Sequence, residues 1–257
     1  MIVNNIYPAF MGEVNKFGIG APCVFVRTAG CNLRCYWKTL GELCDTPEAL
    51  KADSKCGKVM TPQEVASEVF YHKIPLVCLT GGEPLMQKEE ELNVLFTLLA
   101  EGGVNVVVET NGSYSIHPFL DHENVSFVVD YKGASSGEND RMVIGNWMKM
   151  RPCDWLKFVL YNEADMEDML RWCKNNIPTF NGNIAAGLFW GTPKLSYGVD
   201  SHNGLKRNQY RNWHLLEQII LKHPDYHIHL NMQTHKLISL YEDNPEAVHK
   251  IIVPRDL

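Results

Sequence analysis

Residues 23–35 read CVFVRTAGCNLRC, an almost continuously apolar run that passes directly into a polar loop with two cysteines. A strand without polar alternation is expected to be buried on both faces, as strands are in parallel sheets. Six further segments share this character and are predicted to be strands: residues 76–80, 104–109, 125–130, 155–160, 184–190 and 227–231. Their alternation with helical segments predicts an α/β fold with a parallel sheet and crossover helices.

Four segments between these strands have the signals of helices. Thr61-Pro62-Gln63-Glu64 is a capping box with proline at the first helical position. Apolar residues recur with helical spacing over residues 89–100, which two glycines follow. Asn162 is a candidate N-cap for a helix over residues 163–174, and a proline ends a helix over residues 213–222. The apolar stripes of these helices are expected to pack in the core.

The composition limits the class of protein. With 257 residues the chain is long enough to bury a core without disulfides. Its net charge of −6 disfavours a general nucleic-acid binder. No apolar run approaches the ~18 residues of a membrane span, and the N-terminal residues lack the pattern of a secretory signal. We therefore expect a cytoplasmic protein with no nucleic-acid partner and no membrane anchor.

The eight cysteines divide into two groups. Four lie in or beside apolar segments and are expected to be small buried hydrophobic side chains: Cys23, Cys78, Cys153 and Cys173. Cys31, Cys35 and Cys44 instead lie in a polar stretch, and Cys56 is ambiguous. A disulfide framework is not expected in a chain without a secretion signal.

The spacing of Cys31, Cys35 and Cys44 is compatible with a metal centre. Structural zinc normally takes four protein ligands, and residues 1–71 contain no histidine. A 4Fe-4S cluster held by three cysteines leaves one iron without a protein ligand, where a small molecule can chelate. The spacing alone leaves two alternatives open, namely three unrelated thiols and a zinc site completed by Cys56.

Polar and glycine residues follow several of the predicted strands. They are Gly81-Gly82-Glu83-Pro84, Thr110-Asn111-Gly112, Tyr131-Lys132-Gly133 and Met232-Gln233-Thr234-His235-Lys236. Because the carboxyl ends of parallel strands meet at one edge of the sheet, a site built from several strand ends is expected there.

The cysteine segment, with the following Cys44-Asp45-Thr46, resembles the radical S-adenosylmethionine superfamily, whose signature is C-x3-C-x2-C. Thr80-Gly81-Gly82-Glu83-Pro84 is similar to that superfamily's second motif, a turn whose backbone receives the methionine amino group. The resemblance implies a partial, incomplete TIM-like parallel barrel. It also implies a single domain over residues 1–257, with an insertion at 38–43 and a variable segment at 181–212.

Within the superfamily the chain is similar to the 7-carboxy-7-deazaguanine synthases over about residues 7 to 240. The motifs that carry this likeness are Phe10-Met11-Gly12-Glu13, Cys44-Asp45-Thr46, Glu109-Thr110-Asn111-Gly112, Val129-Asp130-Tyr131-Lys132 and Met232-Gln233-Thr234-His235-Lys236, together with Arg27.

The resemblance implies a carbon–nitrogen lyase that contracts the ring of 6-carboxy-5,6,7,8-tetrahydropterin to 7-carboxy-7-deazaguanine, with loss of ammonia, in queuosine and 7-deazapurine biosynthesis. The implied cofactors are a 4Fe-4S cluster, S-adenosylmethionine and Mg²⁺. In the implied reaction the reduced cluster cleaves S-adenosylmethionine to a 5′-deoxyadenosyl radical, which takes a hydrogen atom from C6 of the pterin. The implied partners are the pterin, an electron donor such as flavodoxin and a second copy of the chain in a homodimer.

The resemblance also implies roles for individual residues. The cluster ligands would be Cys31, Cys35 and Cys44, and the Mg²⁺ ligand Thr46. The substrate would contact Phe10, Met11, Gly12, Glu13, Arg27, Thr80 and His235. The cofactor S-adenosylmethionine would contact Asp45, Gly82, Glu109, Asp130, Tyr131, Lys132 and Gln233. These residue types suit the roles, because a guanidinium pairs with a carboxylate and a carboxylate accepts from ribose hydroxyls.

Two departures from the family pattern affect the site. Lys38 stands where the third cysteine is expected, so taking Cys44 as the ligand implies that residues 38–43 are inserted. Met11 replaces the usual glutamine, a change that contacts from main-chain atoms could survive. It stays open whether Trp37 or Leu43 meets the adenine, and whether residues 181–212 form a lid or a dimer contact.

Three rival interpretations remain. Another radical S-adenosylmethionine enzyme, such as a glycyl-radical activase, would need an open cleft of partner size. A zinc-binding protein without enzymatic activity would leave the GGEP turn without a function. A tRNA-binding role is disfavoured by the acidic balance and by the lack of a run rich in lysine and arginine.

Overall fold

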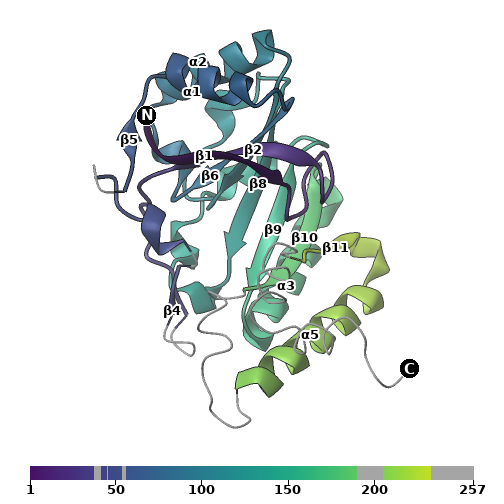
Figure 1. Ribbon diagram of the computed structural model, residues 1–257. Helices are drawn as coiled ribbons and strands as arrows, with labels where there is room; N and C mark the ends of the chain where they lie inside the picture. Colours follow the sequence, from purple (N-terminus) through teal and green to yellow (C-terminus); the bar gives the residue numbers. More distant parts are fainter. Residues whose placement is uncertain (38–41, 45, 54–55, 190–204, 233–257) are drawn as a thin grey trace.

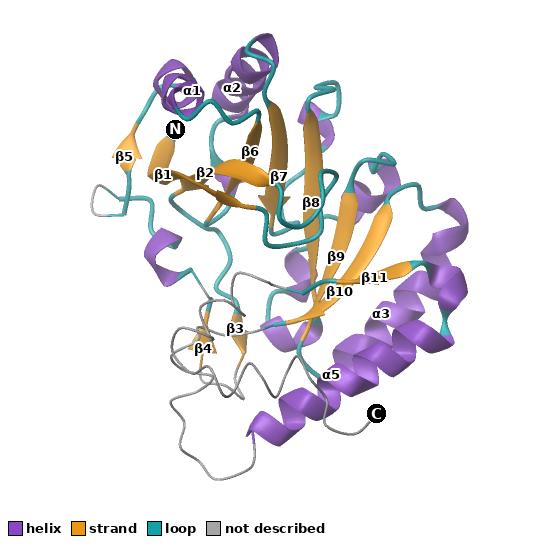
Figure 2. Ribbon diagram, turned by 45° about the vertical axis from the view of Figure 1, so that its right-hand side comes forward, coloured by secondary structure: helices purple, strands orange, loops and turns teal. Residues whose placement is uncertain are grey.

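A computed structural model describes residues 1–257 except 38–41, 45, 54–55, 190–204 and 233–257. Its main sheet has the strand order β11-β10-β9-β8-β7-β6-β2-β1-β5, and a separate pair is formed by β3 and β4. Figures 1 and 2 show that this sheet is strongly curved and that the helices lie on its outer side. The fold is an α/β fold of the incomplete TIM-like barrel type, as expected.

Seven neighbouring strands of the sheet run parallel, and each was predicted from an apolar run. They are β2 (Pro22–Thr28), β6 (Leu76–Gly81), β7 (Asn105–Thr110), β8 (Val125–Lys132), β9 (Trp155–Leu160), β10 (Asn183–Leu188) and β11 (Ile228–Leu230). Four strands were not predicted: β1 (Ile2–Phe10), β3 (Tyr36–Trp37), β4 (Glu42–Leu43) and β5 (Lys58–Val59). β1 pairs antiparallel with β2 and extends the sheet beyond the parallel strands.

The α-helices lie where the periodic patterns predict them. They are α1 (Pro62–Tyr71), α2 (Glu89–Glu101), α3 (Glu163–Asn176) and α5 (Leu205–Lys222). The capping box of Thr61 and Glu64 begins α1, and the Asn162 side chain accepts from the Asp165 N–H at the start of α3. α5 begins eight residues before the predicted start at Trp213. The prediction missed this first part because residues 205–212 are mostly polar and have no apolar stripe. No helix in the described ranges has the length and apolar character to cross a membrane.

Short 3-10 helices occupy several connections. They are η1 (Pro47–Ala49), η2 (Pro84–Met86), η3 (His117–Phe119), η4 (Ala134–Ser136), η5 (Asn139–Arg141), η6 (Ile144–Lys149), η7 (Ile177–Thr179) and η8 (Pro224–Tyr226). The structure covers the two ends of the variable segment 181–212, since β10 and α5 enter it, whereas its middle lies outside the described residues.

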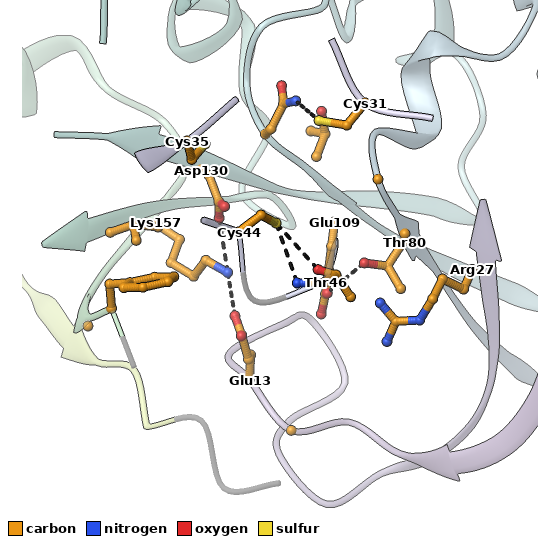
Figure 3. Close-up of a pocket in the computed structure, with 18 of the residues that line it drawn as sticks. Glu13, Arg27, Cys31, Cys35, Cys44, Thr46, Thr80, Glu109, Asp130 and Lys157 are labelled. Atoms are coloured by element: carbon orange, nitrogen blue, oxygen red, sulfur yellow. Dashed lines mark hydrogen bonds and ion pairs between the residues drawn. The ribbon is translucent and has the colours of Figure 1, made fainter. Parts of the chain in front are cut away.

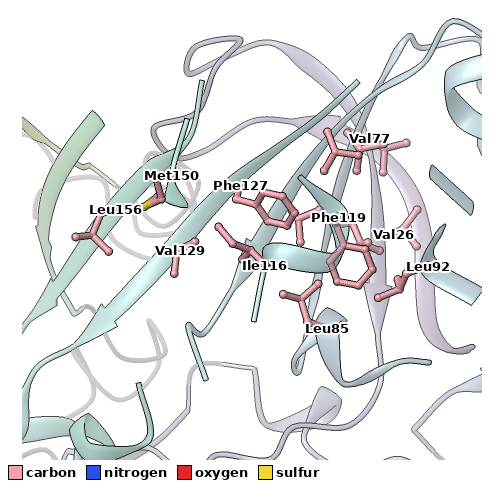
Figure 4. Close-up of a cluster of buried hydrophobic side chains, with 14 of the residues drawn as sticks. Val26, Val77, Leu85, Leu92, Ile116, Phe119, Phe127, Val129, Met150 and Leu156 are labelled. Atoms are coloured by element: carbon pink, nitrogen blue, oxygen red, sulfur yellow. The ribbon is translucent and has the colours of Figure 1, made fainter. Parts of the chain in front are cut away.

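The described core has three clusters: the two largest are the core under the helices and a smaller group on the other face of the strands, and the third surrounds Cys31 and Cys35 with Leu33 and Phe189. The largest cluster lies between the sheet and the helices, and Figure 4 shows members such as Val26, Phe127 and Leu156. The smaller group on the other face, here called the floor cluster, comprises Met11, Cys23, Leu76, Cys78, Val107 and Val128. Three of the four cysteines predicted to be buried are so, while Cys153 is only half-buried, in the turn before β9.

Candidate functional site

A cavity of about 540 Å³ opens at the carboxyl ends of the parallel strands (Figure 3). It is lined by Tyr7, Ala9, Phe10, Gly12, Glu13, Phe25, Arg27, Cys31, Leu33, Cys35, Cys44, Thr46, Glu48, Thr80, Gly81, Gly82, Glu109, Thr110, Asn111, Asp130, Lys132, Lys157, Phe158, Val159, Gly187, Leu188, Phe189 and Asn231. Residues from the start, the middle and the end of the chain therefore meet in one space, as the strand-end argument predicts.

The three candidate cluster ligands, Cys31, Cys35 and Cys44, border this cavity together. Tyr36 in β3 pairs with Leu43 in β4, so Cys35 and Cys44 flank the open end of a short antiparallel hairpin. Glu42 and Leu43, at the end of the segment 38–43 that was predicted to be an insertion, form the second strand of this hairpin. This pairing brings Cys44, nine residues after Cys35, back beside it.

Hydrogen-bond donors point at two of these sulfur atoms. The Leu33 N–H lies 3.4 Å and the Asn111 Nδ2 atom 3.6 Å from Cys31 Sγ. The Thr46 N–H lies 3.5 Å from Cys44 Sγ. Donors of this kind stabilise thiolates and the sulfur ligands of iron–sulfur clusters.

The cysteine environment fits a cluster that is assembled on the folded chain. Burial raises the pKa of the Cys31 thiol, and it raises the pKa of Cys35 to about 11. Thiolates at these positions therefore need a positive partner, which the iron of a bound cluster provides. Within the described residues, no group of three His, Cys, Asp or Glu side chains converges on a single metal ion.

The Gly81-Gly82-Glu83-Pro84 turn supports the cysteine loop through its backbone. The Gly82 N–H donates to Thr28 O and the Glu83 N–H to Gly30 O, at 3.1 and 2.8 Å. A Cβ at position 82 would overlap the carbonyl oxygens of Gly30 and Ala49, so only glycine allows this close approach. The loop and the turn are therefore one packed unit.

Glu83 has a structural place in this turn. Its carboxylate accepts from the Leu85 N–H, the Thr110 hydroxyl and the Asn111 N–H, at 2.7–2.9 Å, and so joins the ends of β6 and β7. It is fully buried, and burial raises its pKa to about 7 in spite of these hydrogen bonds. Through Asn111, Glu83 also positions a donor for the Cys31 sulfur.

An ionic network of buried side chains crosses the opposite side of the cavity. Lys157 of β9 forms ion pairs with Glu13 and with Asp130, the latter at 2.9 Å. Lys132 also pairs with Asp130, at 2.5 Å. Burial alone would lower the pKa of Lys157, but the carboxylates of Asp130, Glu13 and Glu109 hold it well above its usual value. The carboxylate partners thus favour the charged form of both lysines.

Glu109 lies at the end of β7 beside this network. Its Oε2 accepts a 3.2 Å hydrogen bond from the Thr80 hydroxyl. Burial, followed by the nearby Glu13 carboxylate, raises its pKa to about 7. Thr80 and Glu109, which were predicted for different ligands, are thus direct neighbours.

Arg27 reaches the cavity from β2 on the side away from the ionic network (Figure 3). Its Nη2 donates to the Tyr7 hydroxyl at 3.3 Å, and the Tyr7 ring stacks on Phe25 with centroids 5.5 Å apart. Among the described residues, no carboxylate lies within ion-pair distance of the guanidinium. An arginine beside an aromatic pair in a cavity suits a flat ligand with a carboxylate.

Two of the residues expected at the site do not line the cavity. Met11 is 1% exposed and belongs to the floor cluster, and its main-chain N–H and C=O are bonded to Ala21 and Gly20. Tyr131 points to the helix side of β8, where its hydroxyl donates to Asp168 of α3. Side chains alternate along a strand, so Tyr131 faces away from Asp130 and Lys132. Asp45, Gln233 and His235 lie outside the described residues.

Two cavity residues were missed by the sequence analysis, Lys157 and Asn231, and Asn111 was named only as part of a strand-end motif without a role of its own. Lys157 had a signal, because it is the one charged residue in the apolar strand WLKFVL. Asn231 follows β11, and its Oδ1 accepts from the Val14 N–H while its Nδ2 lies 3.5 Å from Glu13 Oε2. The hydrogen bond with Val14 joins positions 217 apart, so no local pattern could reveal it.

Comparisons with known proteins bear on this site. The chain is 32% identical to the 7-carboxy-7-deazaguanine synthase of Koribacter versatilis over 246 residues, which cover 93% of this chain and 96% of that relative. It is 35% identical to the protein of the same name from Leptospira interrogans over 203 residues, or 74% and 82% of the two chains. Its fold is similar to the crystal structure of QueE from Escherichia coli, with a TM-score of 0.63, 15% identity and coverage of 90% and 92%. No protein-family profile matches the chain.

Proposed function

This chain belongs to the 7-carboxy-7-deazaguanine synthase family, and we propose from this premise that it converts 6-carboxy-5,6,7,8-tetrahydropterin to 7-carboxy-7-deazaguanine and ammonia. The observation that carries the proposal is one cavity bordered both by three cysteines and by an arginine–aromatic group. Hydrogen abstraction needs near-contact between the reacting atoms, so the cluster, the cofactor and the substrate must share one space. The product would enter queuosine or 7-deazapurine biosynthesis.

The cysteine side of the cavity would hold the cluster and S-adenosylmethionine. Cys31, Cys35 and Cys44 would bind three irons of a 4Fe-4S cluster, and the cofactor would chelate the fourth. When bound and reduced, this pair supplies the radical that abstracts hydrogen. Gly82 would admit the methionine moiety against the backbone, and Glu109 would accept from the ribose hydroxyls.

Further cofactor contacts are proposed on the basis of the family pattern. Asp130 and Lys132 border the cavity and would lie next to S-adenosylmethionine. Tyr131 would contribute through its main chain, because its side chain is directed to Asp168. Asp45 and Gln233 stay predictions.

The opposite side would bind the pterin. Arg27 would pair with the substrate carboxylate, which supplies the charge that the guanidinium lacks among the described residues. Glu13 would accept from the amino-pyrimidinone edge, with Phe10, Gly12 and Thr80 as further contacts. Thr46, beside Cys44, would ligate Mg²⁺ together with substrate oxygens, since this ion prefers oxygen ligands. His235 stays a prediction. Met11 would support the substrate-binding residues indirectly, by packing in the floor cluster.

We also propose three broader features of the enzyme. The enzyme would work in the cytoplasm as a homodimer and receive its electron from a donor such as flavodoxin. Light scattering of the purified chain tests the dimer. Turnover with reduced flavodoxin in place of a chemical reductant tests the donor.

The test of the reaction is anaerobic. Protein reconstituted with iron and sulfide is incubated with 6-carboxytetrahydropterin, S-adenosylmethionine, Mg²⁺ and reductant, and 7-carboxy-7-deazaguanine is measured. We expect product from the wild type and its loss in Arg27→Gln, with S-adenosylmethionine cleavage still detectable in the variant. Cleavage without product in the wild type would reject this substrate and point to another radical S-adenosylmethionine reaction.

A further inference from the structure

Lys157 is a buried cation in the cavity wall for which the sequence motifs give no role. It lies in the middle of β9, and 9% of its side chain is exposed. Figure 3 shows its ammonium group between two carboxylates, those of Glu13 and Asp130. Removing a charge from water is costly unless it is paired, so a lysine in this strand depends on these partners.

The two partners belong to different halves of the proposed site. Glu13 comes from the loop after β1 and is proposed to meet the pterin. Asp130 comes from β8 and is proposed to meet S-adenosylmethionine. A single ammonium group thus contacts both the substrate side and the cofactor side.

The surroundings of Glu13 show why the contact with Lys157 matters for the charge of its carboxyl group. Glu13 is 7% exposed, and Glu109 and Asp130 add negative charge nearby. Burial and neighbouring negative charge both favour a protonated carboxyl, whereas an adjacent ammonium favours the carboxylate. An ionised carboxylate only accepts hydrogen bonds, so it selects ligands that present N–H groups.

We infer that Lys157 is a positioning residue that determines substrate specificity: it keeps Glu13 ionised and oriented, so that the site recognises the 2-amino-pyrimidinone edge of the pterin. This inference rests on the proposed function. The 2-oxo analogue of the substrate, a tetrahydrolumazine, presents an oxygen where the pterin presents an amino group. Against an ionised Glu13 it binds poorly, and without Lys157 this discrimination decreases.

Lys132 provides a matched control. It is a second lysine in the cavity wall, and it pairs with Asp130 as Lys157 does. Among the described ion pairs only Lys157 joins Glu13. Lys132→Met therefore removes a buried positive charge from the same network while leaving the Lys157–Glu13 contact in place.

The experiment measures binding rather than turnover. Cluster-loaded protein with saturating S-adenosylmethionine, and without reductant, is titrated anaerobically with 6-carboxytetrahydropterin and with its 2-oxo analogue. For Lys157→Met we expect about 10- to 100-fold weaker pterin binding, the range for losing a hydrogen bond to a charged group. We also expect a smaller preference over the analogue. Because Lys132 is itself a proposed contact of S-adenosylmethionine, Lys132→Met is expected to weaken cofactor binding, which saturation offsets, but to keep the wild-type ratio of the two Kd values.

A double-variant comparison isolates the contact with Glu13. In a Glu13→Gln background, Lys157→Met should change the pterin Kd by no more than about twofold, since the partner is already neutral. The double variant carries no charge at position 13 or 157, so the comparison with Glu13→Gln serves even if Lys157→Met alone does not fold.

Three results would contradict either the role of Lys157 or the proposed function. Wild-type preference in folded Lys157→Met, or a further tenfold loss in the Glu13→Gln background, would overturn the inference. Failure of the wild-type enzyme itself to bind the pterin would instead overturn the proposed function.

Discussion

The cysteine at position 44 is the residue on which the cluster assignment depends. It borders the cavity with Cys31 and Cys35, whereas Cys56 lines a separate surface hollow beside β5. This arrangement favours Cys44 over Cys56 as the third ligand, an alternative that spacing alone left open.

We predict opposite outcomes for these two cysteines. Cys44→Ser should lose most of its iron after reconstitution and the change in the electron paramagnetic resonance signal on adding S-adenosylmethionine. Cys56→Ser should keep both. The reverse result would mean that the third ligand is misassigned.

Asn111 is expected to tune the cluster. Its amide points at Cys31 Sγ, and a donor to sulfur stabilises the reduced, more negative cluster. Asn111→Leu should therefore lower the reduction potential by about 20–60 mV, which corresponds to one ordinary hydrogen bond. Ser113→Ala, which loses a bond to Asn32 without touching Cys31, is the control in an anaerobic redox titration. An unchanged potential in Asn111→Leu would show that the contact has no electronic effect.

At the scale of elements, the site depends on two loops that pack against each other. The turn after β6 receives the cysteine loop after β2 through backbone hydrogen bonds, and Gly82 lies where no side chain fits. The hairpin of β3 and β4 then returns Cys44 to the loop. The packing of the two loops and the β3–β4 hairpin are both formed by the chain itself, in the absence of any ligand.

Gly82→Ala tests the packing of the two loops. The added Cβ overlaps two carbonyl oxygens, so we expect a loss of roughly 2 kcal/mol or more in the free energy of unfolding, together with poor cluster retention. Gly145→Ala is the control, because its Cβ would meet only His117 atoms at 3.8–3.9 Å. Chemical denaturation and iron analysis measure both effects, and wild-type values for Gly82→Ala would contradict the packing argument.

At the scale of the whole molecule, the buried acids make stability depend on pH. Glu83 has a pKa of about 7 in the folded chain against 4.5 when exposed. A carboxyl that binds its proton more tightly when folded favours the folded state at low pH. Its contribution is therefore lost as the pH rises from about 4.5 to about 7.

The expected size of this effect is about 3 kcal/mol for Glu83. In protein without a cluster, Glu83→Gln should show a decline in the free energy of unfolding over this pH range that is smaller by about that amount. Urea denaturation at a series of pH values gives the comparison. Equal slopes for variant and wild type would show that Glu83 is already ionised at the lower end of the range.

Whether a strand can be predicted from the sequence depends on whether its own adjacent residues form a recognisable pattern. The seven parallel strands are recognisable because strands buried on both faces, such as Trp155–Leu160, are apolar almost throughout. β1 is less evident, since residues such as Asn4, Asn5 and Pro8 interrupt its apolar pattern. The two-residue strands β3, β4 and β5 are too short for any periodicity.

The sequence by itself determined the order of strands and helices, the caps, and the cysteine and glycine motifs, because each is written within a few adjacent residues. Only the tertiary structure decided which side chains face the cavity. It turned Tyr131 and Met11 away from the cavity and brought Lys157 to Glu13, a partner 144 positions away. Contacts of that range arise from the curvature of the sheet, which no local pattern of residues records.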